Sequence, residues 1–177
     1  QSIRRHGNWS SSRGTPRNVT SMNSDFRDLL HSLAKNEVRY LIVGGYATMQ
    51  YSQPRFTKDL DIWLEPSVDN AARLMEAFSD FGLPLIDVTR EDFEREGLQY
   101  MIGRAPVLFD FLTSLPGLDF QSCWDSRTTD DEEGFEIFFL SKEALIFAKT
   151  QAGRVQDLAD LDEIRRAEER PQQMDDE

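Results

Sequence analysis

Residues 38–64, VRYLIVGGYATMQYSQPRFTKDLDIWL, contain the two patterns that decide the fold. The first is a short β-prone run that ends at Gly44-Gly45 and is followed by a segment suited to a brief helix. The second is the alternation of apolar and polar residues from Arg55 to Leu64, which is typical of a half-buried strand. We therefore predict a strand, a glycine turn, a helix and a strand, in this order.

Regular patterns continue on both sides of this stretch. Apolar residues at helical spacing and capping residues predict four further helices, at 26–34, 67–80, 141–151 and 154–169. Three further strands are predicted, at 98–102, 107–112 and 135–140. The acidic run at residues 130–133 is expected to be a solvated loop. The fold class is therefore α/β or α+β, with a mixed central sheet of about five strands flanked by helices.

Composition divides the chain into three parts. Residues 1–21 contain four arginines and no acidic residue, and they show no apolar periodicity, so we interpret them as a leader or a disordered extension before Met22. Residues 22–170 are expected to form a single domain, and residues 171–177 a frayed tail. The single cysteine cannot form an internal disulfide.

Charge and hydropathy exclude several classes of protein. Residues 22–177 carry 16 basic and 32 acidic side chains, a formal charge of −16, which argues against bulk binding of nucleic acid. No apolar run approaches the length of a membrane span, and no secretory signal is visible. We expect a cytoplasmic protein without a membrane partner.

The aspartates of the strand before Leu64 point to a cation. Residues two apart on a strand face the same way, so Asp59 and Asp61 project side by side. Two neighbouring carboxylates repel each other unless a cation lies between them, and Mg²⁺ suits such a pair when substrate phosphates complete its shell. Asp110 lies within the apolar strand VLFDFL, where a charge must be paired or bound to a metal. The alternatives are a salt bridge from Asp110 to Arg104 and a DLD pair that merely ends a strand.

The double glycine supports a ligand site. Gly44-Gly45 at a strand-to-helix junction lets the backbone approach a ligand closely, and N–H groups at a helix start favour an anion such as a triphosphate. Together with the three aspartates it forms a constellation that could hold a magnesium nucleoside triphosphate.

These residues resemble the DNA polymerase β-type nucleotidyltransferase superfamily. The string LIVGGYA…PRFTKDLDIWL…NAARL…FG is similar to its small prokaryotic members, the minimal and the abortive-infection toxin nucleotidyltransferases of toxin–antitoxin systems. The resemblance covers about residues 24–165 and implies a polymerase β-like fold. Many relatives carry Gly-Ser where this chain has Gly44-Gly45, so here only backbone N–H groups replace the serine hydroxyl.

The resemblance also implies roles for individual residues. It makes Asp59, Asp61 and Asp110 the catalytic carboxylates and the ligands of two Mg²⁺ ions, for which Mn²⁺ could substitute. Asp110 would help to activate the attacking hydroxyl, and Gly44 and Gly45 would hold the triphosphate.

Charged residues elsewhere could line the same site. Arg55 and Thr57 share the strand parity of Asp59 and Asp61, so they are candidates for nucleotide binding. On the C-terminal helices, three charged residues fall among apolar ones: Lys142, Lys149 and Asp157. A structural pair between Lys149 and Asp157 and contacts from the lysines to phosphate are both open.

The leading hypothesis is a Mg²⁺-dependent nucleotidyltransferase in a bacterial toxin–antitoxin or defence setting. It would move a nucleoside monophosphate from a nucleoside triphosphate to a hydroxyl on a partner protein, a tRNA or a small molecule. Gly45 in place of serine motivates the alternative, a catalytically idle nucleotide-binding or protein-interaction module. In a third, purely structural reading, all three aspartates form salt bridges.

Overall fold

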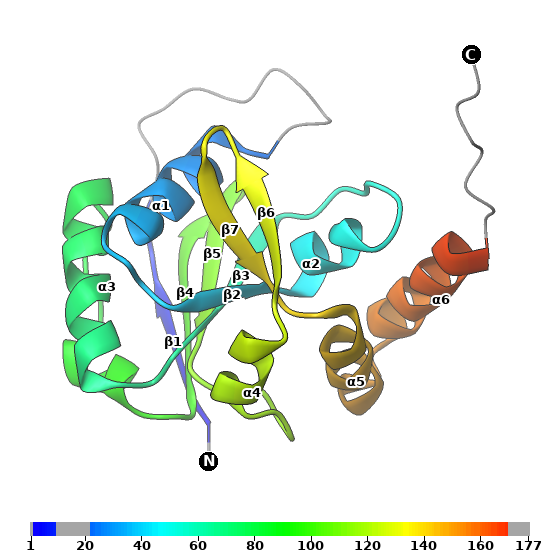
Figure 1. The fold of residues 1–177 in the computed structure, drawn as a ribbon. Helices are drawn as coiled ribbons and strands as arrows, with labels where there is room; N and C mark the ends of the chain where they lie inside the picture. Colours follow the sequence, from blue (N-terminus) through cyan, green and yellow to red (C-terminus); the bar gives the residue numbers. More distant parts are fainter. Residues whose placement is uncertain (1, 10–21, 170–177) are drawn as a thin grey trace.

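A mixed β-sheet occupies the centre of the computed structural model, which describes residues 2–9 and 22–169 (Figure 1). Within these residues the sheet has seven strands in the order β1-β4-β5-β3-β2-β7-β6. The strands are β1 (Ile3–Gly7), β2 (Tyr40–Val43), β3 (Asp59–Leu64), β4 (Leu98–Arg104), β5 (Val107–Leu112), β6 (Thr128–Glu132) and β7 (Phe135–Phe139).

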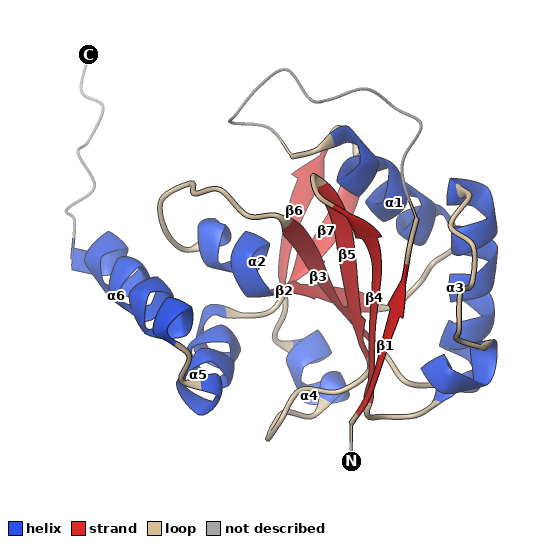
Figure 2. Ribbon diagram, turned by 180° about the vertical axis from the view of Figure 1, so that it is seen from behind, coloured by secondary structure: helices blue, strands red, loops and turns tan. Residues whose placement is uncertain are grey.

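Helices lie on both sides of this sheet (Figure 2). The two amphipathic helices α1 and α3 lie on one side, and α2, α5 and α6 lie on the other (Figures 1 and 2). The described helices are α1 (Ser24–Lys35), α2 (Gly44–Gln50), α3 (Val68–Phe81), the 3₁₀ turn η1 (Arg90–Glu94), α4 (Phe120–Asp125), α5 (Lys142–Ala152) and α6 (Val155–Glu169).

Capping residues mark the limits of three main helices. The side chains of Asn23, Ser67 and Ser141 accept hydrogen bonds from backbone N–H groups in the first turns of α1, α3 and α5. The left-handed residues Gly82 and Gly153 end α3 and α5.

The central strands β3 and β5 present only apolar side chains to one face of the sheet, while the other face carries the aspartates together with Trp63 and Leu112. Leu60 and Ile62 alternate with the aspartates of β3 and are fully buried. Phe109 and Phe111 do the same on β5, where Phe78 of α3 packs edge-on against Phe111. Because this alternation fixes which side chains enter the core, it leaves the aspartates on the opposite face of the sheet.

The sheet has seven strands, where the sequence predicted about five. One addition is β6, which lies in the acidic stretch expected to be a solvated loop and pairs antiparallel with β7. Glu133 and Gly134, both with positive φ, form the two-residue turn between these strands. The sequence analysis missed this strand because an acidic composition indicates exposure to solvent but not whether the backbone pairs with another strand.

The second additional strand, β1, falls in the stretch 1–21 that was interpreted as a leader or disordered extension. Residues 3–7 instead pair in parallel with β4 at the edge of the sheet. Trp9 packs against the rings of Phe81 and Phe109. The short, charged segment has no strand pattern of its own, so its order comes from these tertiary contacts. Residues 1, 10–21 and 170–177, which include the predicted frayed tail, lie outside the described part of the chain.

Strand β3 is shorter than the predicted strand 55–64. It begins at Asp59, the first residue paired with β5, and β2 reaches only to Asp61. Residues 55–58 therefore have no strand to pair with and form a loop. None of the described helices is long and apolar enough to cross a membrane.

Candidate functional site

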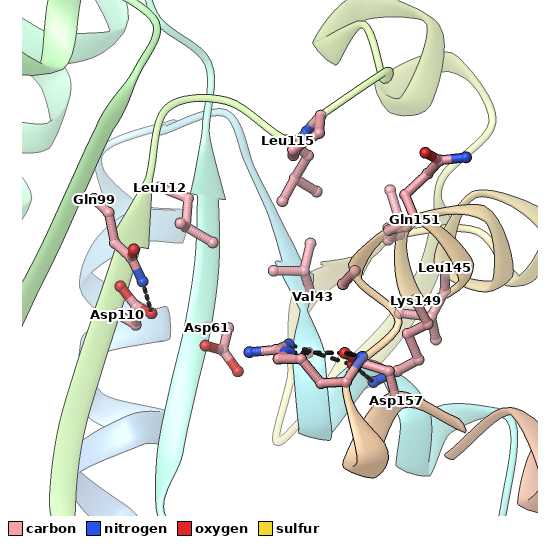
Figure 3. A pocket seen from close by; sticks show the side chains of 16 residues that line it. Val43, Asp61, Gln99, Asp110, Leu112, Leu115, Leu145, Lys149, Gln151 and Asp157 are labelled. Atoms are coloured by element: carbon pink, nitrogen blue, oxygen red, sulfur yellow. Dashed lines mark hydrogen bonds and ion pairs between the residues drawn. The ribbon is translucent and has the colours of Figure 1, made fainter. Parts of the chain in front are cut away.

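Three aspartates lie on adjacent parallel strands at the centre of the sheet. Asp61 of β3 and Asp110 of β5 are direct partners in the parallel register. Asp59 lies two residues before Asp61 and faces the same side of the sheet. Figure 3 shows Asp61 and Asp110 side by side. The predicted convergence of the three residues is therefore present in the fold.

Asp110 is the most buried of the three, and its side chain is only half satisfied. Its Oδ2 accepts a hydrogen bond of 2.8 Å from Nε2 of Gln99 on β4. Its Oδ1 is buried and has no hydrogen-bond partner. The alternative of an Asp110–Arg104 salt bridge is wrong: Arg104 is an exposed residue at the end of β4 and makes no such pair.

The carboxylates of Asp61 and Asp110 bind protons more tightly than a free aspartate does. Burial is the main cause that raises the pKa of Asp61 from 3.8 to about 7, and the charges of Asp59 and Asp110 add to it. The N–H of Gly45, which donates to this carboxylate, and the charge of Lys149 act in the opposite direction. Burial also raises the pKa of Asp110, to about 6. In the described part of the chain no salt bridge neutralises these three aspartates, so the structural reading that paired all of them is not supported.

The double glycine brings the backbone against the aspartates. Gly44 has a φ of +62°, and a Cβ there would overlap the Asp61 carboxylate. At Gly45 a Cβ would come 2.7 Å from the hydroxyl of Thr57, which is hydrogen-bonded to Asp59 Oδ1 at 3.2 Å. The Thr57 hydroxyl thus occupies the space beside Gly45. The glycines and Thr57 therefore lie beside the aspartates, and their binding of a nucleotide stays a prediction.

The opposite wall of the site comes from α5 and α6. Lys149 is buried, and its Nζ lies 3.3 Å from Asp157 Oδ1 and 2.6 Å from Asp160 Oδ2. The structural pair of Lys149 with Asp157 is therefore present. The lysine also lines the cavity next to Asp61, and its contact with phosphate stays a prediction. Two carboxylates share one ammonium, which holds the lysine in place.

Two arginines complete this network. Arg154 Nε lies 2.7 Å from Asp157 Oδ2, while most of the Arg154 side chain stays exposed. Arg55 Nη2 lies 3.0 Å from Asp160 Oδ2, which ties the loop before β3 to α6. Arg55 is therefore close to Gly45 but already held by a carboxylate.

Lys142 is not brought to the site. Its Nζ lies 2.7 Å from Glu168 Oε1, at the other end of α6. The helical wheel put Lys142 and Lys149 on one face, but two turns of helix separate them along the axis.

A cavity of about 300 Å³ lies between the aspartates and this wall (Figure 3). Asp61 and Asp110 line it on the sheet side, and Lys149 and Arg154 on the helix side. The rest of its lining is mainly apolar: Leu112, Leu115, Pro116, Leu140, Leu145 and Ala148. Its size is at the lower end of the range for small-molecule sites, which is about 300–1,000 Å³.

Three residues of the site were missed by the sequence analysis. Asp160 lies one turn after Asp157 on the same face of α6, so helical spacing could have found it. Gln99 has the strand parity that faces Asp110, but nothing local in the sequence indicates it. Arg154 precedes α6 and becomes part of the site only because its guanidinium pairs with Asp157.

The donor set suits Mg²⁺ carried in with a triphosphate. Within residues 2–9 and 22–169, no three His, Cys, Asp or Glu side chains are grouped closely enough to hold a metal ion by themselves. Mg²⁺ usually takes only one or two protein carboxylates and completes its shell with phosphate oxygens and water. The partnerless Oδ1 of Asp110 and the uncompensated charge of Asp61 fit that requirement.

Comparisons with known proteins give no independent support. No protein-family model matches the sequence, and a search of curated proteins finds no relative.

Proposed function

We propose that the protein is a Mg²⁺-dependent nucleotidyltransferase, which moves a nucleoside monophosphate from a nucleoside triphosphate to a hydroxyl group. The observation that carries this proposal is the placement of Asp59, Asp61 and Asp110 on one face of two paired strands, beside the glycine turn and with no ion pair to a described Lys or Arg. The polymerase β-like fold belongs to the same proposal.

The chain's own residues divide the work between the two walls of the cavity. Lys149 and Arg154 are cations on the helix side of the cavity, and in this proposal they bind the β- and γ-phosphates. The Thr57 hydroxyl, which lies next to Gly45 and is hydrogen-bonded to Asp59 Oδ1, would have to turn from that carboxylate to donate to the triphosphate. These contacts would orient the α-phosphate over the aspartates.

The chemical step takes place on the sheet side. The acceptor oxygen forms a bond to the α-phosphorus, the bond from that phosphorus to the bridging oxygen breaks, and pyrophosphate leaves. In this proposal the Asp110 carboxylate, whose Oδ1 has no hydrogen-bond partner among the described residues, helps to activate the acceptor hydroxyl by accepting its proton. Mg²⁺ held by Asp59, Asp61 and Asp110, one or two of them to each ion together with phosphate oxygens and water, would neutralise charge on the entering and leaving oxygens.

Binding is the first test. Melting temperatures are measured with each nucleoside triphosphate, with and without Mg²⁺, for the wild type and for Asp59→Asn/Asp61→Asn. A ligand at about 100 times its dissociation constant adds roughly 2.7 kcal/mol to the free energy of unfolding. We expect a Mg²⁺-dependent rise for the wild type that the double variant loses. No rise with any triphosphate would contradict the proposal.

Turnover separates the enzyme from an idle module. Labelled triphosphate and Mg²⁺ are incubated with a partner protein, tRNA or small alcohols, and transfer of label and release of pyrophosphate are measured for wild type and Asp110→Asn. The enzyme loses transfer in the variant while it keeps nucleotide binding. Binding without turnover, unchanged in Asp110→Asn, would instead favour the alternative of a nucleotide-binding module.

A further inference from the structure

The N-terminal strand β1 places two basic residues at the edge of the aspartate face. Arg4 is paired in register with Gln99 of β4, the residue that donates to Asp110. His6 is paired with Met101, and Met101 is in turn the partner of Asp110 on β5. His6 and Asp110 therefore end a single row of residues across three neighbouring strands.

Strand alternation turns these two side chains toward the aspartates. Arg5, which lies between them, faces the other side of the sheet, where Nη1 donates to the Asp87 carbonyl at 2.9 Å. Arg4 and His6 must then project from the opposite face, the one that carries Asp110. In agreement, the charges of both residues lower the pKa of Asp110.

Arg4 and His6 are also available to a ligand. Both are exposed, and neither side chain makes a hydrogen bond or ion pair with another described residue. The other arginines around the site are held by carboxylates, Arg55 by Asp160 and Arg154 by Asp157. In a chain with a formal charge of −12, two unpaired basic residues beside a carboxylate cluster indicate an anionic ligand.

The order of the strands indicates whether this anionic ligand is the nucleotide or the acceptor. The glycine turn follows β2, and the aspartates lie on β3 and β5, with β4 and β1 beyond them. In an in-line displacement the acceptor approaches from the side opposite the leaving pyrophosphate. If the triphosphate lies against the glycines and Lys149, the acceptor must lie over β4 and β1.

We propose that Arg4 and His6 bind a phosphate group of the acceptor, next to the hydroxyl that is modified. This inference rests on the proposed nucleotidyl transfer and names the class of its second substrate. Neighbouring strands are about 4.8 Å apart, so β1 lies roughly 10 Å from β5, close enough for one substrate to span Asp110 and Arg4. Such a phosphate occurs on a sugar phosphate and beside the 3′-terminal ribose of an RNA.

The test measures KM and kcat for three acceptors at saturating magnesium nucleotide. The acceptors are ribose, ribose 5-phosphate and a short single-stranded oligoribonucleotide with a free 3′-hydroxyl. The variants are Arg4→Gln/His6→Gln, the conservative Arg4→Lys, and Arg104→Gln as a charge-matched control. Arg104 is exposed on the neighbouring strand β4 and has the parity of the opposite face.

We expect the double variant to raise KM about tenfold for the phosphate-bearing acceptors, the loss of a charge-assisted hydrogen bond, with little change in kcat. Arg4→Lys should recover most of the affinity, and Arg104→Gln should change nothing. If the oligoribonucleotide is the better acceptor, the source is RNA, and if ribose 5-phosphate is better, it is a small molecule.

Two outcomes would overturn the inference while leaving the proposed function standing. One is an unchanged KM in the double variant, and the other is a wild-type preference for uncharged ribose. Nucleotide binding keeps the two failures apart, because the Mg²⁺-dependent rise in melting temperature should be the same in wild type and Arg4→Gln/His6→Gln. A wild type without that rise refutes the nucleotidyl transfer itself, and the acceptor site with it.

Discussion

In the ligand-free protein, the ionised forms of Asp61 and Asp110 destabilise the folded state. Both pKa values lie above 3.8, at about 7 and about 6, because the carboxylates are removed from water and crowded together. Carboxylates whose ionised form is disfavoured in this way are expected where a ligand, rather than another side chain, supplies the compensating positive charge. The free energy of unfolding should therefore depend on whether these two carboxylates are ionised.

For these two groups the folded protein binds protons more tightly than the unfolded chain. Their contribution to the free energy of unfolding thus falls as the pH rises from about 4 to about 7. We expect Asp61→Asn to be more stable than wild type by about 1–2 kcal/mol at pH 8, and to gain less at pH 5. Urea unfolding without metal at both pH values measures this.

A surface aspartate provides the control. Asp162→Asn on α6 removes the same charge from an exposed ion pair with Arg165, so its effect should stay within about 0.5 kcal/mol at both pH values. Equal gains from Asp61→Asn and Asp162→Asn would mean that net charge, not crowding in the site, determines the stability.

Gly44 is constrained twice, by its backbone and by its neighbour. Gly44→Ala combines a positive φ with an overlap of the new Cβ and the Asp61 carboxylate. Gly82→Ala is the matched control, because Gly82 has a φ of +85° and nothing within 4 Å of its would-be Cβ. We expect about 1 kcal/mol of destabilisation for Gly82→Ala and at least about 2 kcal/mol for Gly44→Ala, by urea unfolding. Equal losses would show that no overlap occurs.

At the scale of elements, one lysine joins α5 to α6. Lys149→Met leaves Asp157 with Arg154 and Asp160 with Arg55, but removes the ammonium that the two carboxylates share. We expect a loss of about 2–4 kcal/mol in the free energy of unfolding, measured by denaturant titration.

Lys142→Met is the matched control within the same helix. Its partner Glu168 is exposed, so the loss should be below about 1 kcal/mol. Comparable losses for the two variants would contradict a special role of the buried network.

The attachment of β1 depends on a second contact outside the ladder. Trp9 is partly buried against the rings of Phe81 and Phe109. Trp9→Ala should lower the free energy of unfolding by about 1–3 kcal/mol, and Trp9→Phe by less, because the phenyl ring keeps part of the contact. Thermal melts of both variants test this. A Trp9→Ala variant as stable as wild type would mean that β1 is not held by this contact.

For the molecule as a whole, hydrophobic periodicity predicted those helices and strands whose apolar residues repeat at regular spacing along the chain. The helices α1, α3, α5 and α6 and the strands β2, β4, β5 and β7 were found because their apolar residues follow the helical or strand period. The edge strands β1 and β6 were missed because their side chains are mostly polar and their pairing partners are distant or follow later in the chain. Pairing of β1 with a distant strand leaves no local pattern, whereas the hairpin of β6 and β7 is indicated locally only by its Glu133-Gly134 turn.

The same division applies to the candidate site. The aspartates and glycines were predicted because parity and turn chemistry are local properties of the sequence. Gln99, Arg154 and Asp160 act through contacts between elements, as when Asp160 joins Arg55 to Lys149. Lys142 was wrongly predicted to lie at the site, because side chains on the same helical face can lie at different heights along the helix axis.

The strand order determines at which stage of folding the site forms. Asp61 and Asp110 meet only after β3 pairs with β5, and Lys149 joins them only after β2 pairs with β7, so each step closes a long loop. Such non-local pairing is typical of domains that fold in milliseconds to seconds rather than microseconds. A nascent chain still emerging from the ribosome would therefore be inert, and nucleotide binding during refolding should return together with the tryptophan fluorescence of the complete fold.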